Sequence, residues 1–343
     1  MNRPKIGVLL INLGTPDNSD PKSVYAYLKQ FLNDPRVIDL PKVIRYILVN
    51  WIIIPFRYKQ SAHAYQQIWR SKGSPLLTHS QDLVNAVRTK FDASVQIELG
   101  MRYGKPSIES AFSALKACQK IIAIPLFPQY SSAATGSATA ELLRVLGNQW
   151  NIPEISVKRD FFNNADFIAA YASLIKEHLN HKKIDVLVFS FHGLPERHID
   201  KSACRSVCSR SEPCPKPDQL NTYCYRSQCY ETSRLIAKEL DLSLSDHVVS
   251  FQSRLGKTPW IKPYTDLILE DLRQKKVENI AIVCPSFVSD CLETLEEINI
   301  RARAQWLELG GRDFSFIPCL NTHPTWVEGL VKMITREAFE ASH

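Results

Sequence analysis

The 343-residue sequence contains no apolar run long enough to cross a lipid bilayer. Its longest apolar stretch, Ile44–Phe56, is interrupted by Arg45, Asn50 and Pro55, whereas a membrane-spanning helix needs about 20 apolar residues. The N-terminal residues Met1–Lys5 lead directly into a strand pattern, so we expect no signal peptide. Without a secretory context, the nine cysteines are expected to be thiols, metal ligands or core residues rather than disulfides.

Two common ligand-binding signatures are also missing. No Lys/Arg run dominates the sequence and the net charge of +7 is modest, so nucleic acid is not an expected partner. The same charge favours an anionic membrane surface only weakly. No Gly-x-Gly-x-x-Gly follows the first expected strand, Ile6–Asn12, which argues against a dinucleotide site.

What is present is an alternation of strand and helix patterns, which predicts parallel sheets in an α/β fold. The expected strands are Ile6–Asn12, Gln96–Met101, Ile121–Phe127, Glu154–Lys158, Asp185–Phe191, His247–Gln252, Ile280–Pro285 and Phe314–Cys319. The expected helices are Val24–Leu32, Leu83–Phe91, Ile108–Ala117, Ala165–Leu179, Thr232–Leu240 and Thr265–Gln274. The grouping of four strands and then four more predicts two doubly wound domains facing one another, 1–162 and 163–324, since a chain of this length is long for one core.

An acidic motif follows the seventh expected strand, Ile280–Pro285. Either Ser289 or Asp290 suits the N-cap of a helix. On that helix Glu293 and Glu297 would share a face, with Asp290 one turn earlier. Three like charges at the end of a parallel strand suggest a site that binds a cation or a proton. The alternative is a solvated helix start, where acidic residues also suit the helix dipole.

A histidine follows the fifth expected strand in the same way. Asp185–Phe191 is nearly all apolar, as in a strand buried on both faces. It ends at His192, and open α/β sheets bind ligands at the carboxyl ends of their strands. Together with the acidic motif, His192 suggests a divalent-metal or proton-transfer site.

These two segments carry a resemblance to a known family. His192-Gly193-Leu194-Pro195 and Ser289–Leu295 resemble the two signatures of ferrochelatase, which inserts ferrous iron into protoporphyrin IX. Further segments are similar to this family in the same order, from about residue 5 to about residue 325: Ile11–Pro16, Pro128–Ser131, Thr135–Ser137, Phe251–Arg254 and Pro259-Trp260.

The resemblance implies a lyase with two Rossmann-like domains, an active cleft between them and a C-terminal helix, 325–343, that returns to the first domain. It implies insertion of Fe²⁺ into protoporphyrin IX to give protohaem, the last step of haem b biosynthesis, in the cytoplasm or peripherally on the inner face of the membrane. The alternatives are a coproporphyrin III ferrochelatase and a non-catalytic haem or metal carrier. The similarity to sequences of Gram-negative bacteria favours protoporphyrin.

The resemblance also assigns roles to individual residues. His192 and Glu293 would hold or deliver Fe²⁺, because neutral imidazole and carboxylate are suitable ligands for that ion. His192 also titrates near neutral pH, so it can take a pyrrole proton. Glu293, Glu297 and Asp290 would form a carboxylate path for metal entry or proton exit.

Five further residues match positions that lie near the macrocycle or its propionates in the family: Arg57, Tyr65, Ser74, Tyr130 and Trp260. A guanidinium pairs bidentately with a carboxylate, so Arg57 suits a propionate. Each aromatic residue has an equally good alternative as an ordinary core side chain. The stretch Ile44–Phe56 resembles the family's lip at the cleft mouth, which predicts either a membrane-contacting edge or a buried amphipathic helix.

A cysteine-rich insertion, 201–230, stands in the second expected domain. It contains Cys204, Cys208, Cys214, Cys224 and Cys229, and its prolines predict a loop. Four thiolates from one loop can hold zinc or an iron–sulfur cluster. The resemblance favours a [2Fe-2S] cluster over zinc, because some ferrochelatases carry one. Simpler relatives keep a cysteine at the position of Cys229, so the other four are the expected ligands; the remaining alternative is a loop without metal.

Overall fold

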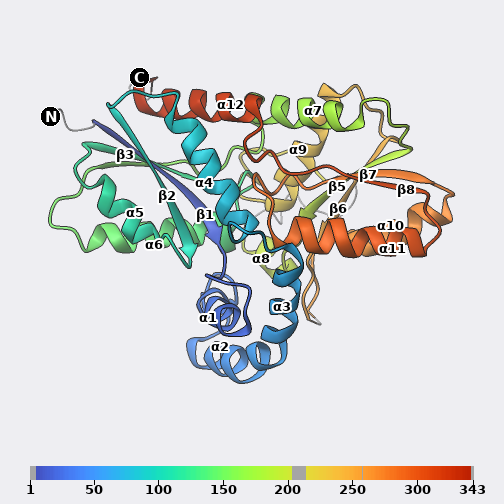
Figure 1. The fold of residues 1–343 in the computed structure, drawn as a ribbon, viewed down its shortest axis with the longest axis horizontal. Helices are drawn as coiled ribbons and strands as arrows, with labels where there is room; N and C mark the ends of the chain where they lie inside the picture. The colour runs from blue at the N-terminus through green and yellow to red at the C-terminus, as the bar shows by residue number, and fades with distance from the viewer. Residues whose placement is uncertain (1–4, 203–213, 257, 341–343) are drawn as a thin grey trace. The chain divides into compact units, whose positions relative to one another are not determined.

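The computed structural model describes residues 5–202, 214–256 and 258–340 (Figure 1). They form two compact units. The first unit draws on Met1–Phe127, Ser132–Asp160 and Val327–His343, and the second on Pro128–Ser131 and Phe161–Trp326. Four cysteines of the insertion are the expected metal ligands. Two of them, Cys204 and Cys208, lie outside the described residues, and the other two, Cys214 and Cys224, lie within them.

A four-stranded parallel sheet forms the centre of the first unit. Its order is β2-β1-β3-β4, with bounds Val95–Tyr103, Ile6–Gly14, Lys120–Pro125 and Glu154–Val157. Strand β1 is buried along nearly its whole length, in keeping with a sequence that is apolar except for Asn12. At its end Gly14 has φ +109°, and a Cβ there would meet the Tyr103 carbonyl oxygen, so this close approach of β1 and β2 requires glycine.

Helices cover both faces of this sheet. The helices of this part of the chain are α1 (Pro21–Leu32), α2 (Lys42–Ile47), η1 (Leu48–Ile53), α3 (Ile54–Ile68), α4 (Pro75–Arg88), α5 (Ile108–Leu115), η2 (Ser132–Gly136), α6 (Ser137–Gly147), α12 (Pro324–Thr335) and η4 (Arg336–Glu340). Helices α5 and α6 pack on β1 and β3 through Phe112, Leu115 and Leu142, which belong to one buried apolar cluster. The C-terminal helices are tied to β4 by the Lys158–Glu337 ion pair, whose Nζ and Oε1 lie 2.8 Å apart.

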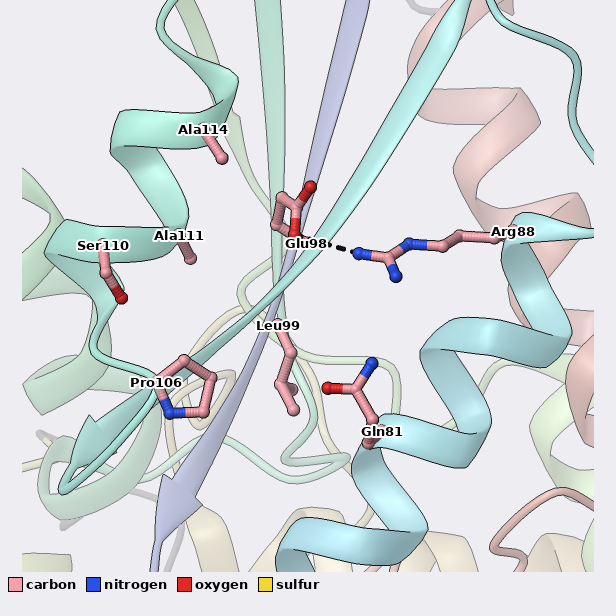
Figure 2. A pocket seen from close by; sticks show the side chains of 8 residues that line it. All are labelled: Gln81, Arg88, Glu98, Leu99, Pro106, Ser110, Ala111 and Ala114. Carbon is pink, nitrogen blue, oxygen red and sulfur yellow. Dashed lines mark hydrogen bonds and ion pairs between the residues drawn. The ribbon is translucent and has the colours of Figure 1, made fainter.

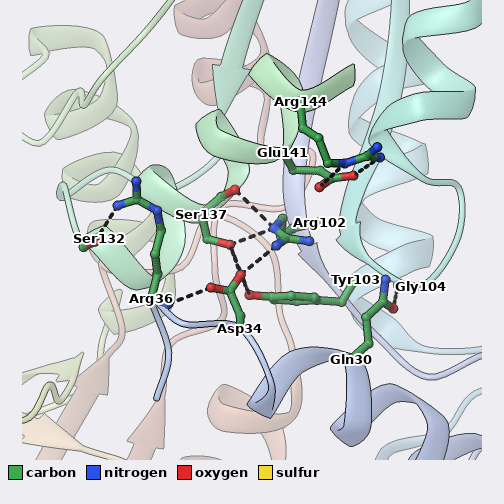
Figure 3. A network of polar contacts seen from close by, with 10 residues as sticks. All are labelled: Gln30, Asp34, Arg36, Arg102, Tyr103, Gly104, Ser132, Ser137, Glu141 and Arg144. Carbon is green, nitrogen blue, oxygen red and sulfur yellow. Dashed lines mark hydrogen bonds and ion pairs between the residues drawn. The ribbon is translucent and has the colours of Figure 1, made fainter. Parts of the chain in front are cut away.

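A buried carboxylate, Asp34, organises the turn after α1 (Figure 3). Its Oδ2 accepts hydrogen bonds from Arg102 at 2.6 Å, from the Tyr103 hydroxyl at 2.9 Å and from the Ser137 hydroxyl at 2.5 Å, and its Oδ1 accepts from the Arg36 backbone N–H at 2.7 Å. Burial opposes ionisation, but these donors together hold the pKa of Asp34 below its ordinary value. The network joins α1, β2 and α6.

A second parallel sheet forms the centre of the second unit. Its order is β6-β5-β7-β8, with bounds His247–Gln252, Val186–His192, Asn279–Val283 and Asp313–Phe316. The helices of this unit are α7 (Ala165–Leu179), α8 (Glu196–Asp200), α9 (Tyr225–Glu239), α10 (Thr265–Gln274), η3 (Glu293–Ala302) and α11 (Arg303–Glu308). Leu269, Ile298 and Trp306 pack α10, η3 and α11 against β5, β7 and β8 in one apolar cluster.

The predicted fold class is confirmed. All eight expected strands form, both sheets are parallel, and α7 and α10 have the predicted bounds. None of the helices formed by the described residues is long and apolar enough to cross a membrane.

Three local predictions are wrong. Helix α4 spans Pro75–Arg88 rather than Leu83–Phe91, because Pro75 occupies the first helical position instead of ending the helix. Helix α9 begins at Tyr225 rather than Thr232, so Cys224 is the N-cap of α9 and Cys229 lies within the helix. The predicted loop was too long because the cysteines and prolines upstream favoured a loop over the whole insertion. The acidic motif forms a π-helix, η3, whose N-cap is Leu292 with no side-chain cap, rather than an α-helix capped by Ser289 or Asp290. A π-helix, with i→i+5 hydrogen bonds, is rare, so a helical pattern in the sequence is assigned to the far commoner α-helix.

Candidate functional site

The carboxyl ends of β5 and β6 lie side by side and carry the candidate site of the second unit. His192, the last residue of β5, pairs in register with Gln252, the last residue of β6. The next backbone step continues this pairing, since Gly193 N–H donates to the Gln252 carbonyl at 2.8 Å. A Cβ on Gly193 would lie 2.7 Å from that carbonyl oxygen and 3.2 Å from the Trp260 ring, so glycine is needed here.

The imidazole of His192 is held in one tautomer. Its Nδ1 lies 2.6 Å from the Gly193 carbonyl oxygen. Because a carbonyl can only accept, Nδ1 carries the proton of the neutral ring, and Nε2 keeps a lone pair. The ring lies between Trp260 and Phe287, with centroid distances of 6.5 and 6.2 Å. His192 therefore presents an Nε2 that can bind a proton or a metal ion.

The carboxylate of Glu297 lies close enough to His192 for the two charges to interact. The backbone N–H of Ser253 donates to its Oε1 at 2.7 Å, and the Ser253 hydroxyl donates to its Oε2 at 2.5 Å. Burial raises the pKa of Glu297 above its ordinary value, and the Ser253 hydrogen bonds and the charges of Arg301 and His192 oppose that effect. The net effect of this environment is a pKa of Glu297 above the ordinary value of a glutamate.

The structure places the other two acidic residues differently. Glu293 begins η3, and its backbone carbonyl accepts from Gln252 Nε2 at 2.9 Å, so it lies beside the end of β6. Asp290 is buried, and its oxygens accept from the Thr294 hydroxyl, the Cys319 backbone N–H and Asn321 Nδ2 at 3.0, 3.1 and 2.7 Å. These hydrogen bonds join the turn before η3 to the segment after β8.

Two of the residues expected to contact the substrate also lie in the second unit. Trp260 packs beside His192, and its Nε1 donates to the Leu255 carbonyl at 2.9 Å. Tyr130 is partly buried, and its ring meets that of Tyr223 edge-on with a centroid distance of 5.4 Å.

The other three lie in the first unit. Arg57 is exposed on α3. Tyr65, on the same helix, is buried between Tyr27 and Trp69, with ring centroids 6.4 and 6.2 Å away. Ser74 precedes α4, and its hydroxyl accepts from the Thr15 hydroxyl at 2.8 Å. Tyr65 and Ser74 thus contribute to the packing of this unit.

The stretch that was expected to form a lip is largely exposed. Seven large apolar side chains of α2, η1 and α3 and their flanks are exposed by half or more: Val43, Ile44, Tyr46, Ile47, Trp51, Ile52 and Phe56. Val49 and Ile54 are buried against α1. The alternative of a buried amphipathic helix is therefore wrong for most of this stretch.

The cysteines that the structure describes in the insertion lie near one another. Cys214, Cys224 and Cys229 are all buried. Burial raises the pKa of Cys229 well above its ordinary value; the Tyr225 hydroxyl opposes this effect, and Cys224 and Cys214 add to it. Among residues 5–202, 214–256 and 258–340, no group of three or more His, Cys, Asp or Glu side chains is arranged to hold a metal ion.

A separate cavity of about 340 Å³ lies in the first unit (Figure 2). Arg88 and Glu98 form an ion pair at its side, with Nη2 and Oε2 2.9 Å apart. The cavity is lined by Gln81, Arg88, Glu98, Leu99, Pro106, Ser110, Ala111 and Ala114. None of the predicted site residues lies among them, so we assign it no part in the candidate site.

Sequence reasoning missed several residues that shape the site. Ser253 has φ +66°, an unusual conformation for a residue other than glycine, and it makes both hydrogen bonds to Glu297. Ser286 accepts from the His192 backbone N–H at 3.0 Å, and the Tyr225 hydroxyl donates to the His192 carbonyl at 2.8 Å. Ser253 lies in Phe251–Arg254, one of the segments that resemble the family, but no local sequence pattern indicates that it contacts η3.

Comparisons with known proteins support the family resemblance found in the sequence. The family model described as Ferrochelatase matches residues 5–338. Ferrochelatase of Legionella pneumophila (strain Lens) is 52% identical over 331 residues, covering 96% of this chain and 99% of the relative. Ferrochelatase of Coxiella burnetii (strain CbuK_Q154) is 49% identical over 335 residues, covering 97% and 94%.

Solved structures support the fold. The structure titled SirB from Bacillus subtilis with Fe³⁺ matches with a TM-score of 0.54 and 11% identity, covering 98% of this chain and 96% of that chain. The cobalt complex of the sirohydrochlorin chelatase SirB from Bacillus subtilis subspecies spizizenii matches with a TM-score of 0.53. The similarity over nearly the whole chain, in sequence and in fold, shows that this protein belongs to the ferrochelatase family of metal chelatases, which are lyases.

Proposed function

We propose that this protein inserts Fe²⁺ into protoporphyrin IX to give protohaem. The observation that carries the proposal is the position of His192 at the carboxyl end of β5, with Nδ1 bound to the Gly193 carbonyl and Glu297 of η3 near enough for the two charges to interact, in a chain of this family. Metallation releases two pyrrole protons, so the site needs a proton acceptor and a route by which protons leave. His192 Nε2 and the Glu297 carboxylate supply both.

In this proposal, His192 takes a pyrrole proton on Nε2, since Nδ1 is committed to the Gly193 carbonyl. Glu297 accepts the second proton. Burial favours its protonated form and the Ser253 donors favour its ionised form, which brings the pKa of this carboxyl group closer to the working pH. The residue beside them, Glu293, passes protons to solvent or delivers iron.

Ferrous iron is a substrate here and finishes bound to the four nitrogens of the porphyrin. The protein therefore needs to supply only one or two donors in passing, and we assign these to His192 and Glu293. We assign Asp290 the role of an anchor for the turn before η3, because its oxygens already accept three hydrogen bonds.

For porphyrin binding we propose that Trp260 and Tyr130 contact the macrocycle and that the exposed Arg57 pairs with a propionate. Tyr65 and Ser74 are buried in the first unit, so we propose that they act there by packing rather than by direct contact with the macrocycle. Coproporphyrin III is the alternative substrate, and it differs by carrying more propionates.

The test is an anaerobic assay of Fe²⁺ insertion with protoporphyrin IX and coproporphyrin III in parallel. We expect faster turnover with protoporphyrin IX. Faster turnover with coproporphyrin III would overturn the substrate assignment, and porphyrin binding without metallation of either substrate would favour a carrier instead.

We further propose that the exposed apolar side chains of 43–56 dock on the surface of a membrane. Basic residues at Lys42, Arg45, Arg57 and Lys59 flank this patch, a composition typical of interfacial segments. Sedimentation with anionic vesicles should carry the protein down, and Trp51→Ser should weaken binding, whereas Trp150→Ser, at an even more exposed tryptophan outside the patch, should not. Equal binding by both variants would contradict the proposal.

For the cysteine insertion we propose a [2Fe-2S] cluster, with zinc as the alternative. Cys214 and Cys224 present neighbouring buried thiols, which fits either centre, and Cys204 and Cys208 would complete the set. Cys229 is engaged with the Tyr225 hydroxyl, which supports its assignment as the cysteine that is not a ligand.

Metal and acid-labile sulfide should be measured in anaerobically purified protein and in five Cys→Ser variants. Serine is a much poorer soft-metal ligand than thiolate, so the centre should be lost in the variants at 204, 208, 214 and 224 and kept at Cys229. Colourless protein with one zinc would favour the alternative, and protein without stoichiometric metal would refute a metal centre.

A further inference from the structure

The start of α9 contacts two parts of the candidate site at once. The first contact is made by Tyr225, which is buried and whose hydroxyl donates to the His192 carbonyl at 2.8 Å. His192 is the last residue of β5, where the sheet offers no further strand donor. On the other side of the same residue, the His192 N–H donates to the Ser286 hydroxyl at 3.0 Å. Both backbone groups of His192 are thus held by side chains.

The second contact is made by Gln228, which is fully buried. Its Oε1 accepts from the Tyr130 backbone N–H at 2.6 Å, and its Nε2 donates to the Thr222 carbonyl at 2.8 Å. One turn further, Thr232 accepts from Gln129 Nε2 at 3.0 Å. The loop that carries Tyr130 is therefore attached to α9 along one face.

Tyr225 and Gln228 are three residues apart in α9, so they lie on neighbouring positions of one helical turn. We propose that these two residues are positioning residues for chelation, with Tyr225 holding the backbone of His192 and Gln228 holding the backbone of Tyr130. The proposal rests on the proposed function of His192 and Tyr130 and adds the element that sets their positions.

The same turn carries the end of the cysteine insertion. Cys224 is the N-cap of α9, and the thiol of Cys229 lies beside the Tyr225 hydroxyl. A change at these cysteines would reach His192 through one side chain. The insertion and the candidate site therefore share one structural element.

The two contacts predict different kinetic effects. Tyr225→Phe removes one hydrogen bond to the residue that takes the proton, so kcat for Fe²⁺ insertion into protoporphyrin IX should fall roughly 3- to 10-fold with KM within about twofold. Gln228→Met removes the acceptor for the Tyr130 backbone, so KM for the porphyrin should rise by a similar factor with kcat within about twofold.

The matched control is Tyr230→Phe, which removes another buried hydroxyl from α9, one that accepts from Arg226 at 3.3 Å. It should leave both parameters within about twofold of wild type. Bound metal and sulfide should be equal in all the purified proteins, which separates a direct effect on the site from loss of a centre at the cysteines.

A crossed pattern, with kcat lowered by Tyr225→Phe and KM raised by Gln228→Met, would support the proposal. Equal effects of Tyr225→Phe and Tyr230→Phe, or the same parameter changed by both variants of the proposed pair, would overturn it. If Tyr225→Phe does not fold, Ser286→Ala decides in its place, since it frees the other side of His192 and should lower kcat likewise. A wild-type protein that metallates neither porphyrin would overturn the proposed function and this inference with it.

Discussion

The hydroxyl of Ser253 offers a direct test of the role of Glu297. It donates to Glu297 Oε2 at 2.5 Å, and the backbone N–H of the same residue donates to Oε1. Ser253→Ala removes the first hydrogen bond and keeps the second. The ionised carboxylate loses a donor while burial continues to favour its protonated form, so the pKa of Glu297 should rise further.

The size of the effect follows from the kind of hydrogen bond. A hydrogen bond to a charged group contributes about 1.5–3 kcal/mol, and 1.36 kcal/mol corresponds to a factor of ten, so the ionisation constant of Glu297 should fall roughly 10- to 150-fold. If Glu297 must be ionised to accept a proton, the acid limb of the pH–rate profile should move to higher pH. The rate on that limb should fall by about the same factor, and the rate on the plateau should be kept.

The assay is kcat for anaerobic Fe²⁺ insertion, measured across the pH range for wild type, Ser253→Ala and Ser253→Gly. Glycine lacks the same hydroxyl but tolerates φ +66°, so it controls for backbone strain. Both variants should show the same displacement of the limb. An unchanged limb with a uniformly lower rate would refute the proposed role of Glu297 in proton acceptance.

The remaining predictions concern the acidic residues and the histidine. His192→Ala should abolish metallation while porphyrin binding, followed by fluorescence quenching, is largely kept; near wild-type turnover would be incompatible with its role. Glu293→Gln and Glu297→Gln should each remove most of the metallation activity, because an amide neither accepts a proton nor ligates iron well, and near wild-type turnover in either variant would contradict the role of that residue. The pKa of Asp34 is lowered in the fold, so this carboxylate contributes stability that is present above its ordinary pKa and is lost as pH falls through the lowered one. Asp34→Asn should therefore cost about 1.5–3 kcal/mol of unfolding free energy at pH 7, because Arg102, whose side chain is 16% exposed, loses its charge partner but keeps some access to water, and little once the pH is below the lowered pKa. The control is Glu98→Gln, which removes the charge partner of Arg88 in a more exposed ion pair and should cost at most about 1 kcal/mol of unfolding free energy. Denaturant melts measure both losses, and equal losses at pH 7 would contradict this reasoning.

Much of the fold could be predicted from the sequence alone because the central strands β1, β3, β5 and β7 are almost entirely buried and therefore almost continuously apolar. The bounds of β6, α7 and α10 were predicted to the residue, and the other strands to within a few residues. The same local reasoning placed His192 and the acidic motif after strands, where the carboxyl ends of a parallel sheet collect ligands.

The tertiary structure decided how these pieces meet. Asp290 was grouped with the acidic motif by spacing, yet its partners Cys319 and Asn321 follow another strand and are not visible in any local pattern. The π-helical form of η3 was hidden for a different reason, since π-helices are rare and a helical sequence pattern favours the common α-helix.

The sequence by itself determined which residues are candidates for the chemistry, because residue type sets what a side chain can donate, accept or ligate. Only the fold decided their state: the proton of His192 is placed by the Gly193 carbonyl, and the ionisation of Glu297 is set by its burial and by Ser253. Burial and directed hydrogen bonds depend on which chain segments pack together. That packing is set by the register of β5 with β6 and by the turn that leads into η3, over separations that no local pattern spans.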